Sequence, residues 1–162
     1  MANHMGKIEA RLLEMGIELP EAPKPAAVYI PAITVDHLVF VSGHDCRKNG
    51  KFLYQGKIGS DLTLEQGQEA AKQCMINGLA SLKNEIGSLD KVKRIVKLLG
   101  FVNSAPGFVE QPAVINGASE FLERVFEENG KHARSAIGTS ELPFNIPVEI
   151  EFIVELKKDE HI

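Results

Sequence analysis

The sequence predicts an α+β fold in which a mixed sheet carries two long helices on one face. The patterns follow the order strands, helix, strand, helix and two strands, without an internal repeat. Of the 162 residues, 44% are hydrophobic and 25% are charged, which is usual for a globular domain of this length. We therefore expect residues 1–162 to form a single domain, with residues 1–24 as an N-terminal arm.

The N-terminal region contains a short helical pattern and then strand patterns. Residues 8–15 are amphipathic, and three prolines within residues 20–25 forbid a helix and favour an extended chain. β-branched and aromatic runs predict strands over residues 28–30 and 38–41. The turn signal Asn49-Gly50 precedes a weaker strand pattern at residues 52–55.

The two helices have clear boundaries in the sequence. Thr63, with Gln66 three residues later, has the spacing of a capping box, and apolar residues then recur at helical spacing as far as Gly87. A second helical stripe spans about residues 108–128 and ends at Asn129-Gly130. The remaining strands are expected at residues 95–102, 133–139 and 148–156.

Residues 95–102 are apolar at nearly every position, which is typical of a strand buried on both faces. Two helices can cover only one face of the sheet, so a partner subunit is the simplest cover for the other. The alternative is that the arm folds over that face. We favour oligomerisation because an arm with three prolines would shield a sheet incompletely.

Charge and cysteine usage exclude several function classes. Eighteen basic and 22 acidic residues give a net charge of −4, which would repel a polyanion, so nucleic acid is an unfavourable partner. Cys46 and Cys74 lack the spacing of a metal site or a redox pair, and no apolar run is long enough to span a membrane. We expect a cytoplasmic protein without a membrane contact.

The last quarter of the chain carries the candidate chemistry. Strand alternation over residues 148–156 places Glu149, Glu151 and Glu155 on one face, where such carboxylates usually point to water. Arg134 stands among small residues that leave room for a ligand, and its planar guanidinium suits the carboxylate of an organic acid. An ion pair of Arg134 with Glu149 or Glu151 explains the arginine equally well at this point.

The run ARSAIGTSELP at residues 133–143, followed by VEIE at residues 148–151, resembles the signature of the RidA/YjgF family, whose members are also called L-PSP endoribonuclease-like proteins. The resemblance extends from about residue 25 to residue 156 and includes Pro25 with Tyr29, the Val41-Ser42-Gly43 motif and Asn116. It implies a chorismate-mutase-like fold that assembles as a homotrimer around a central barrel, with clefts between subunits. It also implies that no metal or cofactor is required.

The activity that this resemblance implies is an enamine/imine deaminase, which hydrolyses reactive 2-imino acids to 2-keto acids and ammonia. Its ligand would be a small imine or keto acid that bears a carboxylate. A protein that binds such a carboxylate without turnover is the alternative. An endoribonuclease or translation inhibitor, with His44 or His132 in acid–base roles, is less favoured because of the net charge.

The resemblance also assigns roles to residues. Arg134 matches the arginine that binds the substrate carboxylate, and Glu149 matches the glutamate near the attacking water. The expected substrate-binding positions are Tyr29, Ser42, Gly43, Asn116 and Ala136, where Ala136 stands in place of a frequent cysteine. His44 is expected at the rim of the cleft.

Overall fold

The computed structural model describes residues 5–159. Its helices are α1 (Lys7–Glu14), α2 (Leu64–Ile86) and α3 (Gln111–Phe126), with 3-10 turns at Leu89–Lys91, Glu127–Gly130 and Pro143–Asn145. Its strands are β1 (Ala32–Val35), β2 (Leu38–His44), β3 (Arg47–Lys48), β4 (Lys51–Phe52), β5 (Val92–Asn103), β6 (Ala133–Thr139) and β7 (Val148–Leu156).

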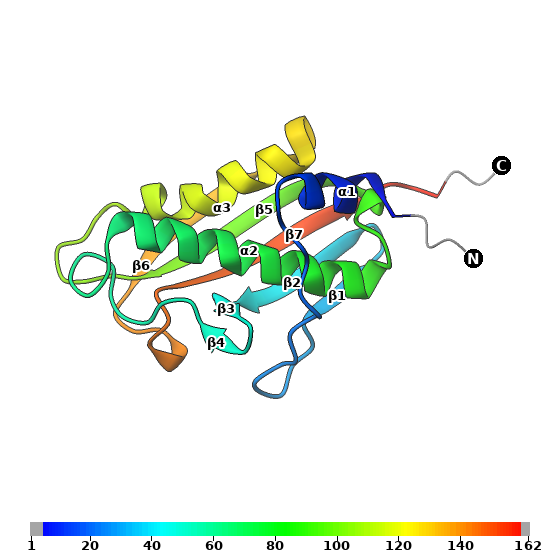
Figure 1. Ribbon diagram of the computed structural model, residues 1–162. Helices are drawn as coiled ribbons and strands as arrows, with labels where there is room; N and C mark the ends of the chain where they lie inside the picture. Colours follow the sequence, from blue (N-terminus) through cyan, green and yellow to red (C-terminus); the bar gives the residue numbers. More distant parts are fainter. Residues whose placement is uncertain (1–4, 160–162) are drawn as a thin grey trace.

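The main sheet has the strand order β1-β2-β7-β5-β6. Strands β5 and β6 pair in parallel, and the other neighbours pair antiparallel. Helices α2 and α3 pack side by side on one face of this sheet (Figure 1). The mixed sheet with both long helices on one face is therefore confirmed.

Helix α2 begins and ends where its sequence predicts. The hydroxyl of Thr63 accepts from the Gln66 backbone at 3.1 Å, and the Gln66 side chain accepts from the Thr63 backbone at 2.9 Å, which completes the capping box. Gly87 ends the helix with a φ of 87°, a conformation that favours glycine.

Gly117 allows helix α3 to pack closely against α2. A Cβ atom on Gly117 would lie 2.2 Å from the backbone oxygen of Gln68, so only glycine allows this approach. The Gln68 side chain also donates to the backbone oxygen of Ala113 at 2.9 Å. These contacts set the position of the α3 residues that face β6.

Two strand predictions near the N-terminus are wrong. Residues 28–30 lie in a bend, and the strand starts at Ala32, because Pro31 has no N–H to donate and Val28 is fully exposed. Of residues 52–55, only Phe52 belongs to a strand, within a small hairpin that turns at the expected Asn49-Gly50. The chain then leaves the hairpin, and the Gln55 side chain donates to the Phe144 carbonyl at 2.8 Å.

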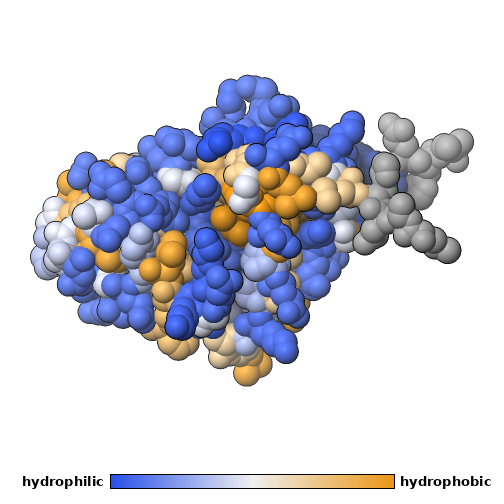
Figure 2. Space-filling model, in the orientation of Figure 1, coloured by the Kyte–Doolittle hydropathy of each residue, from blue (hydrophilic) through white to orange (hydrophobic). Residues whose placement is uncertain are grey.

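The second face of the main sheet is apolar and uncovered within residues 5–159. Ile33, Val35, Phe40 and Ile137 are 41% to 51% exposed, and a hollow of about 650 Å³ lies between Tyr29 and the sheet. The helix side, seen in Figure 2, is mostly hydrophilic. We call the uncovered side the open face.

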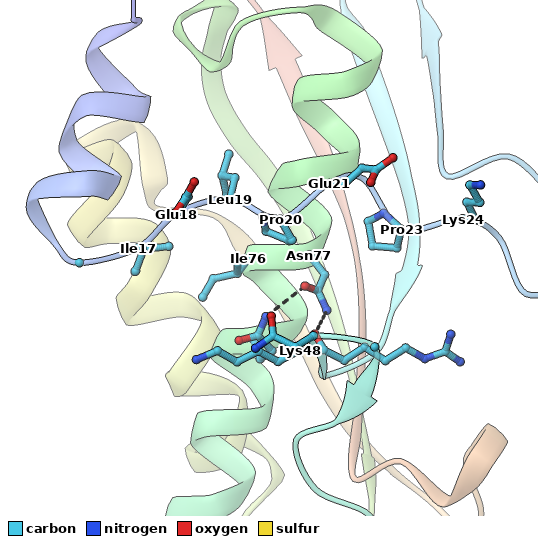
Figure 3. A pocket seen from close by; sticks show the side chains of 15 residues that line it. Ile17, Glu18, Leu19, Pro20, Glu21, Pro23, Lys24, Lys48, Ile76 and Asn77 are labelled. Atoms are coloured by element: carbon cyan, nitrogen blue, oxygen red, sulfur yellow. Dashed lines mark hydrogen bonds between the residues drawn. The ribbon is translucent and has the colours of Figure 1, made fainter.

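The N-terminal arm lies on the helix side. The Asp90 carboxylate accepts from the backbone N–H groups of Lys7 and Ile8 at 2.8 and 2.9 Å and so caps α1. Residues 17–24 then cross α2 beside Ile76 and Asn77, as Figure 3 shows. The alternative in which the arm covers the open face is therefore wrong for its described residues.

Candidate functional site

Arg134 lies on the edge strand β6 and points toward α3. Its Nη1 atom donates to Oδ1 of Asn116 at 2.9 Å and to Oγ of Ser119 at 3.1 Å, and its Nη2 atom donates to the Pro112 carbonyl at 3.3 Å. Ala136, two residues along the strand, faces the same side and packs against the core. Arg134, Asn116 and Ala136 form the arginine half-site.

The positive charge of Arg134 has no ion-pair partner within 4.0 Å in the described part of the chain. The open alternative of an ion pair with Glu149 or Glu151 is therefore wrong within one chain. Arg134 pairs in register with Leu98, which is buried under the helices, whereas Glu149 and Glu151 pair with residues of β5 that face the other way.

The contacts of Arg134 leave a defined pair of donors. Both hydrogens of Nη1 and one hydrogen of Nη2 are used by the three neutral acceptors on α3. Nε donates to no acceptor, and Nη2 donates to Pro112 alone, among residues 5–159. The Nε–H and the neighbouring Nη2–H form one edge of the planar guanidinium. This pair matches the two oxygens of a carboxylate.

Glu149 lies on the open face of β7 against the backbone of β2. A Cβ atom on Gly43 would be 2.9 Å from Cδ of Glu149, so glycine makes room for the carboxyl group. Burial raises the pKa of Glu149 above its ordinary value, and the negative charges of Asp45 and Glu151 raise it further. The group is therefore able to exchange a proton nearer to neutral pH than an exposed glutamate.

Ser42 and Tyr29 lie on the same part of the open face, where they line one hollow with Glu151. The β2–β7 register shifts between Val41 and His44, and Gly43 within this irregularity lies against Glu149. The Ser42 hydroxyl donates to the Ile30 carbonyl at 2.7 Å and so holds the segment that carries Tyr29 along β2. Tyr29, Ser42, Gly43 and Glu149 form the glutamate half-site.

His44 lines a small hollow of about 40 Å³ together with Tyr29 and Gly43, although most of its side chain is buried. The imidazole is buried, with Nδ1 2.6 Å from the Ser42 carbonyl and Nε2 2.7 Å from Oγ of Ser81 on α2. Burial lowers the pKa of His44, so the ring is neutral at pH 7. The side chain therefore links β2 to α2, and its place at the rim of a cleft stays a prediction.

The two half-sites are not brought together within one chain. The arginine half-site faces α3 at the edge of the sheet, whereas the glutamate half-site lies on the open face. Strand β5 lies between β6 and β7, which carry Arg134 and Glu149. A single cleft that used both groups would have to draw them from two copies of the chain.

Ser119 and His132 belong to this region and were missed as a pair by the sequence analysis. Ser119 contacts Arg134, and Nε2 of His132 lies 2.9 Å from the Ser119 hydroxyl, while Nδ1 lies 2.6 Å from the Gly130 carbonyl. The helical spacing of Asn116 and Ser119 is a signal that would have placed both on one face of α3. Both ring nitrogens of His132, like those of His44, are hydrogen-bonded within the described residues.

A groove of about 770 Å³ lies between the arm and the β3–β4 hairpin and contains none of the expected site residues (Figure 3). At its floor, the Asn77 amide donates to the carbonyls of Asp45 and Arg47 at 2.8 and 2.9 Å and thereby holds the hairpin to α2. Residues 5–159 contain no cluster of three or more metal-ligating side chains and no helix long and apolar enough to cross a membrane.

Comparison with known proteins gives consistent matches over nearly the whole chain. The family model described as "YjgF/chorismate_mutase-like, putative endoribonuclease" matches residues 9–156. The chain is 41% identical to Protein TCP17 of Trypanosoma cruzi over 152 residues, which cover 93% of this chain and 95% of that protein. It is 31% identical to the 2-iminobutanoate/2-iminopropanoate deaminase of Dermatophagoides farinae, with coverage of 87% and 95%.

A solved structure agrees with these sequence matches. The protein Atu1372 from Agrobacterium tumefaciens, described as having unknown function, superposes with a TM-score of 0.87 at 45% identity, over 93% of this chain and 92% of that one. The chain belongs to the RidA/YjgF family, with its YjgF/chorismate-mutase-like fold.

Proposed function

We propose that this protein is an enamine/imine deaminase that hydrolyses 2-imino acids to 2-keto acids and ammonia in a cleft between two subunits. The observation that carries the proposal is the state of Arg134, which is held by neutral acceptors only and keeps its Nε–H and one Nη2–H without a partner in residues 5–159. A permanently charged group arranged in this way suits the carboxylate of an organic acid.

The reaction needs little beyond positioning, because an imine carbon is already electrophilic. Arg134 binds the substrate carboxylate and orients the C=N bond. Glu149 accepts a proton from a water molecule whose oxygen bonds to the imine carbon and returns it to the nitrogen, which gives a carbinolamine. Glu149 then accepts the hydroxyl proton of the carbinolamine and passes it to the nitrogen, so the C–N bond breaks and ammonia leaves as the C=O bond forms.

The separation of the half-sites supports assembly of the site from two protomers. Its second support is the apolar open face, where Ile33, Val35 and Phe40 would be buried by a neighbouring sheet. A homotrimer with a central barrel would bury this face and bring the arginine half-site of one protomer to the glutamate half-site of the next. Such an assembly would make three equivalent clefts.

The test is an assay of keto acid release from freshly generated 2-iminobutanoate and several other 2-imino acids, together with light scattering for the oligomeric state. The wild-type protein should accelerate release, whereas Arg134→Ala and Glu149→Gln should abolish the acceleration and leave the oligomer intact. Arg124→Ala is a matched control, because Arg124 is exposed on α3 and forms no ion pair in residues 5–159. Carboxylate binding without acceleration by the wild type would contradict the proposal and favour a carrier or sensor of keto acids.

A further inference from the structure

The guanidinium of Arg134 rests on a row of acceptors along α3. Pro112, Asn116 and Ser119 follow one another at helical spacing and present their oxygen atoms to Nη1 and Nη2. Asn116 and Pro112 accept through carbonyl oxygens that carry no hydrogen. Ser119 differs, because a hydroxyl can either accept a hydrogen bond from Arg134 or turn its own hydrogen toward it.

His132 determines which way the Ser119 hydroxyl points. Its Nε2 atom lies 2.9 Å from Oγ of Ser119, and its Nδ1 atom lies 2.6 Å from the Gly130 carbonyl. A carbonyl can only accept, so Nδ1 carries the hydrogen, and in this tautomer Nε2 accepts from Ser119. The lone pairs of the Ser119 oxygen are then directed at Arg134.

The result is a chain of hydrogen bonds in which every donor points the same way. Arg134 donates to Ser119, Ser119 donates to His132, and His132 donates to Gly130. The last acceptor is itself fixed, because Gly130 is buried and a Cβ atom there would lie 2.2 Å from the Leu122 carbonyl of α3. This series of hydrogen bonds therefore begins at Arg134 on β6 and ends at Gly130, which packs against α3.

We propose that Ser119 and His132 are positioning residues that fix the plane of the Arg134 guanidinium. By occupying the second hydrogen of Nη1, they leave the Nε–H and one Nη2–H as the pair that meets a substrate carboxylate. The inference rests on the proposed role of Arg134 as the carboxylate-binding group. It adds that the orientation of the guanidinium, and not its charge alone, determines how strongly a 2-keto or 2-imino acid binds.

Loss of these hydrogen bonds would weaken the binding of the substrate more than it would slow turnover. Without Ser119, Nη1 keeps its bond to Asn116 but loses its second acceptor, so the guanidinium can rotate away from the carboxylate. A carboxylate contact is made in both the ground state and the transition state, so its weakening raises KM and leaves kcat nearly unchanged. Because Asn116 and Pro112 still hold the guanidinium, only part of the contribution of a hydrogen bond to a charged group is lost, and we expect an affinity loss of about 5- to 20-fold.

The experiment is a calorimetric titration of the full chain with 2-oxobutanoate, combined with KM and kcat for 2-iminobutanoate. Ser119→Ala and His132→Phe should each weaken binding about 5- to 20-fold, and the double variant should be no weaker than the worse single one, because both act in one chain. Ser119→Thr retains the hydroxyl and should restore binding. Ser60→Ala and His37→Gln are controls, because both side chains are exposed and form no hydrogen bond in residues 5–159.

A protein in which residue 134 lacks the planar guanidinium distinguishes a positioning role of Ser119 from general structural damage. In Arg134→Lys, which keeps the charge, Ser119→Ala should change the affinity less than about 2-fold. An equal loss in both backgrounds, or wild-type affinity in Ser119→Ala, would overturn the inference. If the wild type binds 2-oxobutanoate in a Ser119-dependent manner but shows no turnover, the deaminase proposal fails and the positioning role stands, whereas absence of binding by the wild type overturns both.

Discussion

Gly43→Ala tests whether the exact placement of the Glu149 carboxyl group matters for the reaction. The added Cβ atom would lie 2.9 Å from Cδ, 3.1 Å from Cγ and 3.2 Å from Oε1 of Glu149. Ordinary carbon contacts are about 3.5 to 4.0 Å, so the carboxyl group must move by at least about 0.6 Å. Because a displacement of about 1 Å at a reacting group costs about 100-fold in rate, we expect kcat to fall about 10- to 100-fold.

The fold should tolerate this change. Glu149 is half-buried and can turn toward the open face, so overpacking should cost less than about 1 kcal/mol. Replacement of glycine by alanine at an ordinary φ recovers about as much through the unfolded chain. We therefore expect an unchanged melting temperature and an unchanged affinity for 2-oxobutanoate, which Arg134 supplies.

The assay is steady-state release of keto acid from generated 2-iminobutanoate, with thermal unfolding in parallel. Gly138→Ala is the matched control, because its Cβ atom would meet side-chain ends of Gln111 and Ser104 at 2.8 and 2.9 Å on β6, away from Glu149. The control should keep the wild-type kcat. A wild-type kcat in Gly43→Ala would refute the reasoning, because the position of the carboxyl group would then be irrelevant to the rate.

Three further predictions concern stability. The pKa of Glu149 is raised in the folded state, chiefly by burial, so its stabilising contribution is present at low pH and is lost as pH rises through the folded pKa. Glu149→Gln should therefore raise the melting temperature by a few degrees at neutral pH, and this gain should shrink in acid. A constant gain at all pH values would contradict this prediction. Asp90→Ala removes the cap of α1 and should cost about 1 kcal/mol in chemical unfolding while it increases proteolysis of the arm, and an unchanged proteolytic pattern would argue against the anchoring role. Gly117→Ala places a Cβ atom 2.2 Å from the Gln68 carbonyl of α2 and should cost about 3 kcal/mol or more, so a variant as stable as the wild type would disprove the close helix approach.

Local signals in the sequence were sufficient for most of the architecture. Strand alternation over residues 148–156 assigns Ile150 and Glu149 to opposite faces, and the structure buries one and leaves the other half-exposed. The Thr63–Gln66 spacing locates the start of α2 because capping depends on residues within one turn. The bend at residues 28–30 could not be read in this way, because strand formation there depends on a partner strand and not on β propensity.

The arrangement of the site depends on contacts that are distant in the chain. The sequence of β6 does not show which of its two faces packs against the helices, because small residues occupy both faces. The side of the sheet on which Arg134 lies could therefore not be predicted. The pairing of Ser119 with His132 requires α3 to lie against the start of β6. The separation of Arg134 from Glu149 follows from the strand order, in which β5 lies between their strands.

The central claim is that each cleft takes Arg134 from one protomer and Glu149 from another. The most direct measurement mixes the Arg134→Ala and Glu149→Gln variants after reversible dissociation and assays keto acid release from the reassembled oligomers. Random mixing at equal concentrations leaves about a quarter of the clefts with both native groups, so activity should return to about a quarter of the wild-type value. Activity no higher than that of the separate variants would contradict the account.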